Sequence, residues 1–434
     1  MPRVLFVAFH FAPEMTVATR RAVRIARSLA ERGWQVDVLA RELSLADALD
    51  PALWTDVPGV TIHRAPVLSL KQHARRWRQE RLAARAAPSP SPAPASTGAP
   101  TSRPTMTQAP VQGRARALLD FAHRNLAVPD AQVGFLAPAI AVGSRLPRPD
   151  VVLATLPPPT DALVGHALAR RFGVRLVLDY RDPWLATREF EALPAWRKRV
   201  EAAMERAVVD QGARAVATTR GIAEVLQQRY GVEVAYVPNA CEPERFAEVQ
   251  PRAFAGPTLV YTGNLYGGRG LEQVFAAMAR VRASGRTVPR LCYLGATPAD
   301  ARAQAEGAGV ADLVDVEGMR PAAEALAAMR GATANVNVVG PHHARQIPAK
   351  AFEQIAAGRP ILLQTPLPSD TADLLADVPG VRVVPFDDAR AMEVAVAAIA
   401  HEGNRDLAQA IPEALTVAAT MDTLEATLRA AIGC

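Results

Sequence analysis

The sequence predicts an α/β protein with two doubly wound domains, each built on a parallel sheet with helices on both faces. Strand-like and helix-like patterns alternate along almost the whole chain. Several strand patterns, such as residues 3–9, are continuously apolar, as strands buried on both faces are. The chain also has 434 residues, more than one hydrophobic core usually organises. In such folds ligands bind at the carboxyl ends of the strands and, with two domains, in the cleft between them.

The first domain is expected over residues 1–240. Its opening strand is followed by apolar residues at helical spacing, a stop at Gly33 and a second strand, which together make a β-α-β unit. The strands expected in this domain span residues 3–9, 34–40, 60–65, 150–156, 175–182, 214–219 and 233–239.

Residues 86–112 interrupt the alternation. They hold seven prolines and almost no large apolar side chains. Such a segment buries too little surface to offset the entropy of ordering, so we expect a disordered insert inside the first domain.

The second domain is expected over residues 257–415, after a linker near 240–256. Its expected strands span residues 258–265, 290–297, 313–319, 333–339, 360–365 and 381–386. A C-terminal helix over residues 416–434 follows the second domain, and it is expected to pack back on the first domain.

Cysteine usage and hydropathy indicate a cytoplasmic protein. The cysteines show no CxxC spacing, which argues for a reducing compartment and against a disulfide framework or a zinc site. They are Cys241, Cys292 and Cys434. The short apolar run at the start is broken by His10, which is typical of a first strand rather than of a signal peptide. No apolar run approaches the 18 residues of a membrane-span candidate.

Positive charge is concentrated in one stretch. Residues 71–124 carry ten Lys/Arg against two acids, whereas the whole chain has a net charge of only +6. The part at 71–85 fits the anionic inner face of the cytoplasmic membrane, and a solvated helix beside a linker is an equal alternative. Beyond Trp77 the stretch lacks interleaved aromatic residues, so no nucleic-acid partner is expected.

A glycine-rich loop follows the first strand of the second domain. In "YTGNLYGGRGLEQ", Gly263 and Gly268 free the backbone to approach a ligand, and the helix that follows offers its N-terminus to an anion. Arg269 adds a fixed charge with a fork geometry suited to phosphate. A plain glycine turn is the alternative.

The stretch "IPAKAFEQIAAGRPIL", residues 347–362, places a lysine and a glutamate in one helix. Pro348 suits the first turn, and Lys350 lies in that turn, where a cation gains nothing from the helix dipole. A lysine there makes sense if it meets an external anion such as a diphosphate. Glu353, on the same face, can accept two hydrogen bonds from the diol of a ribose. An internal Lys350–Glu353 pair is the alternative.

Further candidates follow strands of the first domain. "DYRDPW" ends a strand, so Asp179, Arg181 and Asp182 are expected to point towards the cleft, with an Asp–Arg structural pair as the alternative. His10 and residues 16–20 follow the first strand and could meet an acceptor or a phosphate.

Five stretches in order resemble the bacterial family 4 glycosyltransferases. They are "FHFAPEMTVATRRAVRIARSLAERGWQVDVLARE", "VLDYRDPW", "YVPNACEPERF", "LVYTGNLYGGRGLEQ" and "IPAKAFEQIAAGRPIL". The resemblance covers nearly the whole chain except the insert at 86–112. It implies the GT-B architecture, in which two Rossmann-like domains face each other across a cleft.

The resemblance implies a retaining transferase that uses a nucleotide-diphosphate sugar, with UDP or GDP the expected nucleotides, and needs no metal or other cofactor. Glu353 would hold the ribose, and Arg269 and Lys350 would clamp the diphosphate. Arg181 and Asp182 are the candidates for contact with the transferred sugar. The remaining donor contacts expected are Gly263, Asn264, Gly268, Gln346, Ile347, Pro348 and Ala349. His342 and His343 lack further ligands at metal spacing, so a metal site is not expected.

The acceptor expected is a glycan or lipid-linked precursor of a cell-surface polysaccharide or glycolipid. The basic stretch 71–85 and the apolar window 133–142 would suit a lipid-linked molecule at the inner face of the membrane.

Some positions depart from the family pattern. Many relatives carry a glutamate where this chain has Arg345 and an arginine where it has Asn264. Two rivals therefore stay open: a binding or scaffold protein that has lost catalysis, and a non-hydrolysing sugar-nucleotide epimerase, which shares the GT-B fold.

Overall fold

The computed structural model describes residues 1–14, 16–44, 47–50, 57–68, 127–185, 188–210, 213–265, 268–403, 405–407 and 411–433. The expected insert at 86–112 and the basic stretch at 71–85 both lie outside the described residues.

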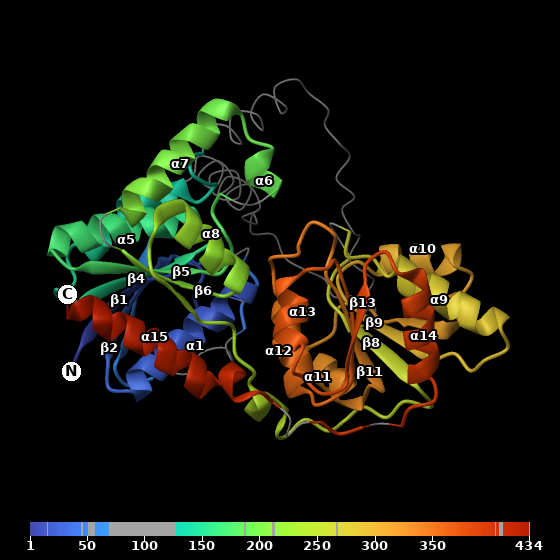
Figure 1. Cartoon of the computed structure of the whole chain (residues 1–434). Coiled ribbons are helices and arrows are strands. Elements are labelled where there is room, and N and C mark those ends of the chain that lie inside the picture. The colour runs from blue at the N-terminus through green and yellow to red at the C-terminus, as the bar shows by residue number, and fades with distance from the viewer. Residues whose placement is uncertain are drawn as a thin grey trace, which may run out of the picture.

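In the described part of the first domain, seven parallel strands form one sheet (Figure 1). In spatial order they are β3 (Val60–Ala65), β2 (Gln35–Arg41), β1 (Arg3–Val7), β4 (Val151–Leu156), β5 (Arg175–Tyr180), β6 (Arg214–Ala217) and β7 (Val234–Tyr236). The order reverses direction at β1, which pairs with both β2 and β4. Each strand expected in this domain corresponds to one of these seven.

Helices cover both faces of this sheet. Successive side chains of a strand point to opposite faces, and here the side chains on both faces are apolar. Leu5 and Val7 of β1 face one core, and Val4 and Phe6 face the other. The first core is covered by η2 (Val133–Phe135), α4 (Leu136–Gly143), α5 (Pro159–Phe172), α6 (Arg188–Glu191), α7 (Ala195–Val209) and α8 (Arg220–Tyr230). The second is covered by α1 (Val17–Glu31) and α15 (Val417–Ile432).

The apolar window 133–142 forms η2 and most of α4. Phe135 and Ala139 are buried in the first core, and Leu136 and Ile140 pack against it. Packing therefore explains part of the apolar character of this window, and its suitability for a lipid-linked molecule stays a prediction.

Six parallel strands form the sheet of the second domain in its described residues (Figure 1). In spatial order they are β10 (Val314–Val316), β9 (Arg290–Leu294), β8 (Thr258–Thr262), β11 (Ala334–Val338), β12 (Ile361–Thr365) and β13 (Val381–Pro385). They match the six strands expected from the sequence.

The second sheet is also covered on both faces. The outer face carries α9 (Glu272–Ala283), α10 (Pro298–Gly307) and α14 (Ala389–Ile399). The face towards the first domain carries α11 (Ala322–Gly331), α12 (Ala349–Ala356) and α13 (Asp370–Leu375). Three short 3₁₀ helices, η3 (Pro243–Phe246), η4 (Ala311–Leu313) and η5 (Glu413–Leu415), lie in the connections. Two sheets with helices on both faces confirm the predicted fold class.

The chain crosses between the domains twice. After β7 it enters the second domain, and after η5 it returns, so that α15 lies on the sheet of the first domain (Figure 1). Leu424 and Leu428 of α15 are buried in the core that α1 also covers. Trp34 Nε1 donates a hydrogen bond to Glu425 at 3.0 Å, which ties this helix to the loop after α1. None of the described helices is both long and apolar enough to cross a membrane.

A buried ion pair joins α1 to the sheet. Arg21 donates two hydrogen bonds to Asp179 at the end of β5, of 2.7 and 3.0 Å. Its remaining N–H groups reach the carbonyl oxygens of Val237 and Pro238, just after β7. Burial alone raises the pKa of Asp179, but the charge and hydrogen bonds of Arg21 and Thr155 outweigh it, and the pKa lies below its usual value. Asp179 is fully buried, so the expectation that it points into the cleft is wrong.

Removal of Arg21 should destabilise the first domain. Arg21→Ala leaves the Asp179 carboxylate buried without its cation, which costs about 3–5 kcal/mol. The change is measurable by urea denaturation with tryptophan fluorescence, because every tryptophan lies before residue 240. They are Trp34, Trp54, Trp77, Trp184 and Trp196.

Lys198→Ala is the matched control for that experiment, because Lys198 lies in the same domain as the tryptophans. Lys198 pairs with Glu191 at the surface at 3.4 Å, and such pairs are worth roughly 0–1 kcal/mol. Equal destabilisation by the two substitutions would contradict the structural role assigned to Arg21.

Candidate functional site

A cavity of about 630 Å³ lies between the two domains. Its walls come from the carboxyl ends of strands in both sheets: Arg181 and Asp182 follow β5, and residues 261–264 comprise the end of β8 and the start of the loop after it. Helices α1 and α12 face each other across it. This is the position at which doubly wound domains commonly bind ligands.

The loop after β8 is fixed by a close approach of two backbone segments. Gly263 has a φ of +126°, and its N–H donates to the carbonyl oxygen of Leu294 at 2.9 Å. A Cβ on Gly295 would lie 1.9 Å from the Gly263 carbonyl oxygen, so a side chain at 295 would displace the loop. The side chain of Asn264 accepts a hydrogen bond from the N–H of Ala296 at 2.7 Å. Asn264 therefore also holds the loop in place.

Arg269 lines the cavity and is oriented by Gln346. Its Nη2 donates to Gln346 Oε1 at 3.0 Å. Gln346 itself is not among the residues that line the cavity, and neither is the exposed Gly268. Both were expected to contact the ligand directly; in the structure the side chain of Gln346 bonds Arg269 instead.

Lys350 lines the cavity at the N-terminus of α12 and is half-buried. Its Nζ lies 3.8 Å from the centre of the Tyr261 ring, a cation–π contact. Burial, assisted by the nearby charge of Arg269, lowers the pKa of Lys350 to about 7. The first turn of α12 contains no acidic residue. Ile347, Pro348 and Ala349 line the cavity beside this helix end, which can bind an anion through its free N–H groups.

Glu353 lies one turn further along α12 and bonds two arginines. Its Oε1 accepts hydrogen bonds from Arg245 Nη1 at 2.8 Å and from Arg20 Nη1. Arg20 comes from α1 of the first domain, so this contact crosses the cavity. Glu353 thus pairs with Arg20 and Arg245, and the alternative of an internal pair with Lys350 is wrong.

The first-domain wall contains Arg181 and Asp182, as expected. Arg181 Nε donates to the carbonyl oxygen of Leu156 at 3.2 Å, and Nη2 donates to that of Pro157. Burial lowers the pKa of Arg181, and the charge of Asp179 opposes this effect. His10 bonds Glu14 at 2.9 Å and is not among the lining residues.

Arg345, the departure from the family pattern, is used at the domain interface. Its Nη1 donates to the carbonyl oxygen of Gly221 in α8 at 3.0 Å. Its own carbonyl oxygen accepts a hydrogen bond from Thr219, the N-cap of α8. Arg345 is not among the residues that line the cavity.

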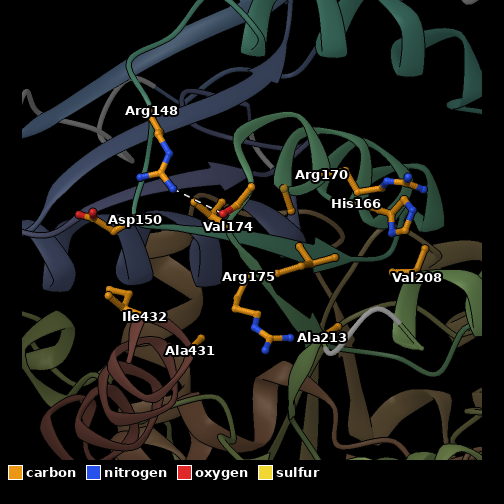
Figure 2. A pocket seen from close by; sticks show the side chains of 13 residues that line it. Arg148, Asp150, His166, Arg170, Val174, Arg175, Val208, Ala213, Ala431 and Ile432 are labelled. Carbon is orange, nitrogen blue, oxygen red and sulfur yellow. Dashed lines mark hydrogen bonds between the residues drawn. The ribbon is translucent and has the colours of Figure 1, made fainter. Parts of the chain in front are cut away.

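A second cavity of about 580 Å³ lies at the opposite, amino-terminal edge of the first sheet (Figure 2). Arg148 at its rim donates to the carbonyl oxygens of Phe172 and Gly173 at the end of α5. Burial, and then the charge of Arg170, lowers the pKa of His166 in its wall. Arg148 thus interacts with the negative, C-terminal end of the α5 helix dipole. The cavity between the domains is therefore the stronger candidate for the functional site.

Among the described residues, no group of three or more His, Cys, Asp and Glu side chains is placed to hold a metal ion.

A family model described as a glycosyl transferase 4-like domain matches residues 18–240. This is slightly more than half of the chain. The chain belongs to this glycosyltransferase family. The family resemblance predicted from the sequence motifs is thereby confirmed, and the matched region includes the first-domain wall of the cavity.

Solved glycosyltransferase structures share the complete two-domain fold. Sucrose-phosphate synthase (tll1590) from Thermosynechococcus elongatus superposes with a TM-score of 0.60 at 15% identity, covering 100% of this chain and 96% of that one. Anabaena Alr3699/HepE, solved with UDP and glucose, gives 0.59 at 12% identity, covering 99% and 100%. WaaG, a glycosyltransferase involved in lipopolysaccharide biosynthesis, gives 0.51 at 16%, covering 99% and 95%. These similarities show the GT-B fold. No curated protein sequence is significantly similar to this chain.

The structure brings most of the predicted site residues of this glycosyltransferase together in one cavity. They are Arg181, Asp182, Gly263, Asn264, Arg269, Ile347, Pro348, Ala349, Lys350 and Glu353. Sequence reasoning gave no role to Arg24, Glu242 and Arg245, which also line it. Glu242 and Arg245 lie in the "PNACEPERF" motif, and charged residues in so specific a motif were the available signal.

Anion binding in the cavity should take up a proton above neutral pH. With a pKa of about 7, Lys350 is protonated below this pH and largely neutral above it, and a bound anion favours its charged form. Sulfate does not titrate in this range. Its affinity should therefore fall as pH rises above about 7, and its binding at pH 8 should consume protons. Calorimetry in two buffers of different ionisation enthalpy measures this uptake.

Two substitutions separate the charge of Lys350 from its titration. Lys350→Met should bind sulfate weakly without proton uptake, whereas Lys350→Arg should bind it without the pH dependence. Binding of sulfate to the unaltered protein at pH 8 with no proton uptake would refute the assignment.

Proposed function

We propose that the protein is a retaining glycosyltransferase that moves a hexosyl group from a nucleotide-diphosphate sugar to a glycan or lipid-linked acceptor, without a metal ion. The observation that carries the proposal is the arrangement of α12, whose N-terminal end and Lys350 stand beside Arg269 while Glu353 lies one turn away. In a nucleotide the diphosphate and the ribose are also close together, so one bound molecule could reach both Lys350 and Glu353.

The donor's diphosphate would occupy the space between Arg269, Lys350 and the N-terminus of α12. Two cations and free N–H groups there match its charge and its oxygen atoms. The ribose diol would donate its hydrogen bonds to Glu353, in exchange for one or both arginines. UDP or GDP donors are the first candidates, and structures of the similar Anabaena protein with UDP-glucose support UDP.

In the proposed reaction, the bond between the anomeric carbon and the diphosphate oxygen breaks, and its electron pair moves to the diphosphate. Arg269, Lys350 and the end of α12 stabilise this charge, which is the role a metal ion plays in other transferases. The acceptor hydroxyl attacks on the same face and passes its proton to the leaving phosphate oxygen, so that the configuration is retained. Arg181 and Asp182, on the opposite wall, would contact the transferred sugar. Domain closure excludes water.

The acceptor is proposed to be a precursor of a cell-surface polysaccharide or glycolipid, met at the inner face of the cytoplasmic membrane. The basic stretch 71–85 supports contact with an anionic surface, and the similarity to WaaG is consistent with a lipid-linked product.

The donor site is testable by calorimetric titration with UDP, GDP and dTDP. We expect one nucleotide to bind, and Glu353→Ala to weaken its binding by about 10- to 100-fold, since two hydrogen bonds to a carboxylate are lost. Glu324→Ala, an exposed glutamate on α11, is the control and should leave binding unchanged.

Binding of none of the three nucleotides by the folded protein would contradict the transferase and favour a scaffold role. When a donor sugar has been found, the anomeric proton coupling of the product tests retention by NMR. Activity that disappears with EDTA would refute metal independence.

A further inference from the structure

The arginines on the first-domain side of the cavity differ in their partners. Arg21 is neutralised by Asp179, which lies outside the cavity. Arg24 pairs with Glu242 at 3.3 Å. Arg181 has Asp182 next to it and interacts electrostatically with it. These three cations keep a carboxylate nearby whatever ligand enters.

Arg20 and Arg245 instead share one carboxylate oxygen, Oε1 of Glu353. Arg245 has a second acid within reach, because its Nη1 lies 3.7 Å from Glu242. For Arg20, Glu353 is the one carboxylate within ion-pair distance among the described residues. A ribose that takes the hydrogen-bonding capacity of Glu353 therefore leaves Arg20 without a carboxylate partner among the described residues. Arg245, in contrast, still has Glu242 within reach.

The surroundings of Arg20 favour an anion. The N-cap of α1, Thr16, also lines the cavity, so this end of a 15-residue helix faces the ligand space. The first turn of α1 contains no acidic residue. A helix N-terminus and a guanidinium together make a site for phosphate oxygens. The side chain of Arg20 is 40% exposed, which leaves it room to turn from Glu353.

We infer that the acceptor of this transferase carries a phosphate group, and that Arg20 and the N-terminal end of α1 bind it once the donor ribose has taken Glu353. The inference rests on the proposed function. It makes Arg20 a switch residue: it pairs with Glu353 before the donor enters and with the acceptor afterwards. Donor binding then prepares the acceptor site, which imposes an order on the two substrates.

The same guanidinium could instead meet the diphosphate of the donor itself, and the experiment separates these two sources of phosphate. The unaltered protein, Arg20→Gln and Arg27→Gln are titrated with the preferred nucleoside diphosphate. Each protein is then saturated with that nucleotide and titrated with inorganic phosphate at constant ionic strength. Arg27 is the matched control, since it lies on the same helix but does not line the cavity.

The expected result has two parts. Arg20→Gln binds the nucleotide as tightly as the unaltered protein or more tightly, because Glu353 has lost a competitor. Its nucleotide complex binds phosphate about tenfold more weakly, or more, through loss of a charge-assisted hydrogen bond. Arg27→Gln changes neither affinity.

Two results would overturn the inference while leaving the transferase intact. One is a nucleotide affinity about tenfold lower in Arg20→Gln, which would assign Arg20 to the donor. The other is a nucleotide complex that binds no phosphate, or binds it equally well with and without Arg20. If no nucleotide binds to any of the proteins, the proposed function itself fails, and the inference fails with it.

Discussion

The buried pair of Arg21 and Asp179 is the contact on which the geometry of the cavity depends. A carboxylate fully buried at the end of β5 is costly unless a cation and further hydrogen bonds satisfy it. Arg21 meets this need with two N–H bonds and uses the others on the carbonyl oxygens that follow β7. Because a guanidinium is planar, this fork fixes the rotation of α1 about its own axis. That rotation decides that Arg20 and Arg24, on the same face of the helix, point into the space between the domains.

Cations in this cavity are held by exchangeable partners. Arg269 is held by an amide oxygen, Arg24 by Glu242, and Arg20 and Arg245 by one oxygen of Glu353. Lys350 differs from these arginines in its partner and in its charge. Its Nζ lies against the Tyr261 ring, and burial lowers its pKa to about 7. Positive charge is therefore available to an anion, yet little of it stands unpaired. A ligand replaces existing partners, so affinity for it is the difference between two sets of hydrogen bonds, and modest changes at these residues shift binding strongly.

The architecture could be predicted from sequence because it depends on local patterns. Continuously apolar strands, helical spacing and glycines at helix ends predict all the strands of both sheets. The motif around 347–362 likewise places Lys350 and Glu353 in one helix beside a ligand. Long-range pairing could not be predicted. Whether Asp179 faces the cleft or a core depends on which of the four arginines in α1 reaches it, and neighbouring arginines look alike in a sequence. For the same reason Gln346 was expected to touch a ligand, whereas its side chain orients Arg269. The apolar window 133–142 was open to two interpretations because packing and lipid contact require the same residue types.

The contacts of Arg345 give its departure from the family pattern a physical meaning. Residue 345 lies in the segment that leads into α12, and it exchanges hydrogen bonds with Thr219 and Gly221 at the start of α8 in the first domain. The end of α12 that carries Lys350 is therefore tied to the facing domain through a few residues. Hydrogen bonds to main-chain carbonyl oxygens are worth little net energy, because water replaces them when they break. Such a contact can open and re-form as the domains move, as a transferase that must admit two substrates and release two products requires. An acidic side chain at 345 could not donate to the carbonyl of Gly221, so this contact between the domains depends on the arginine.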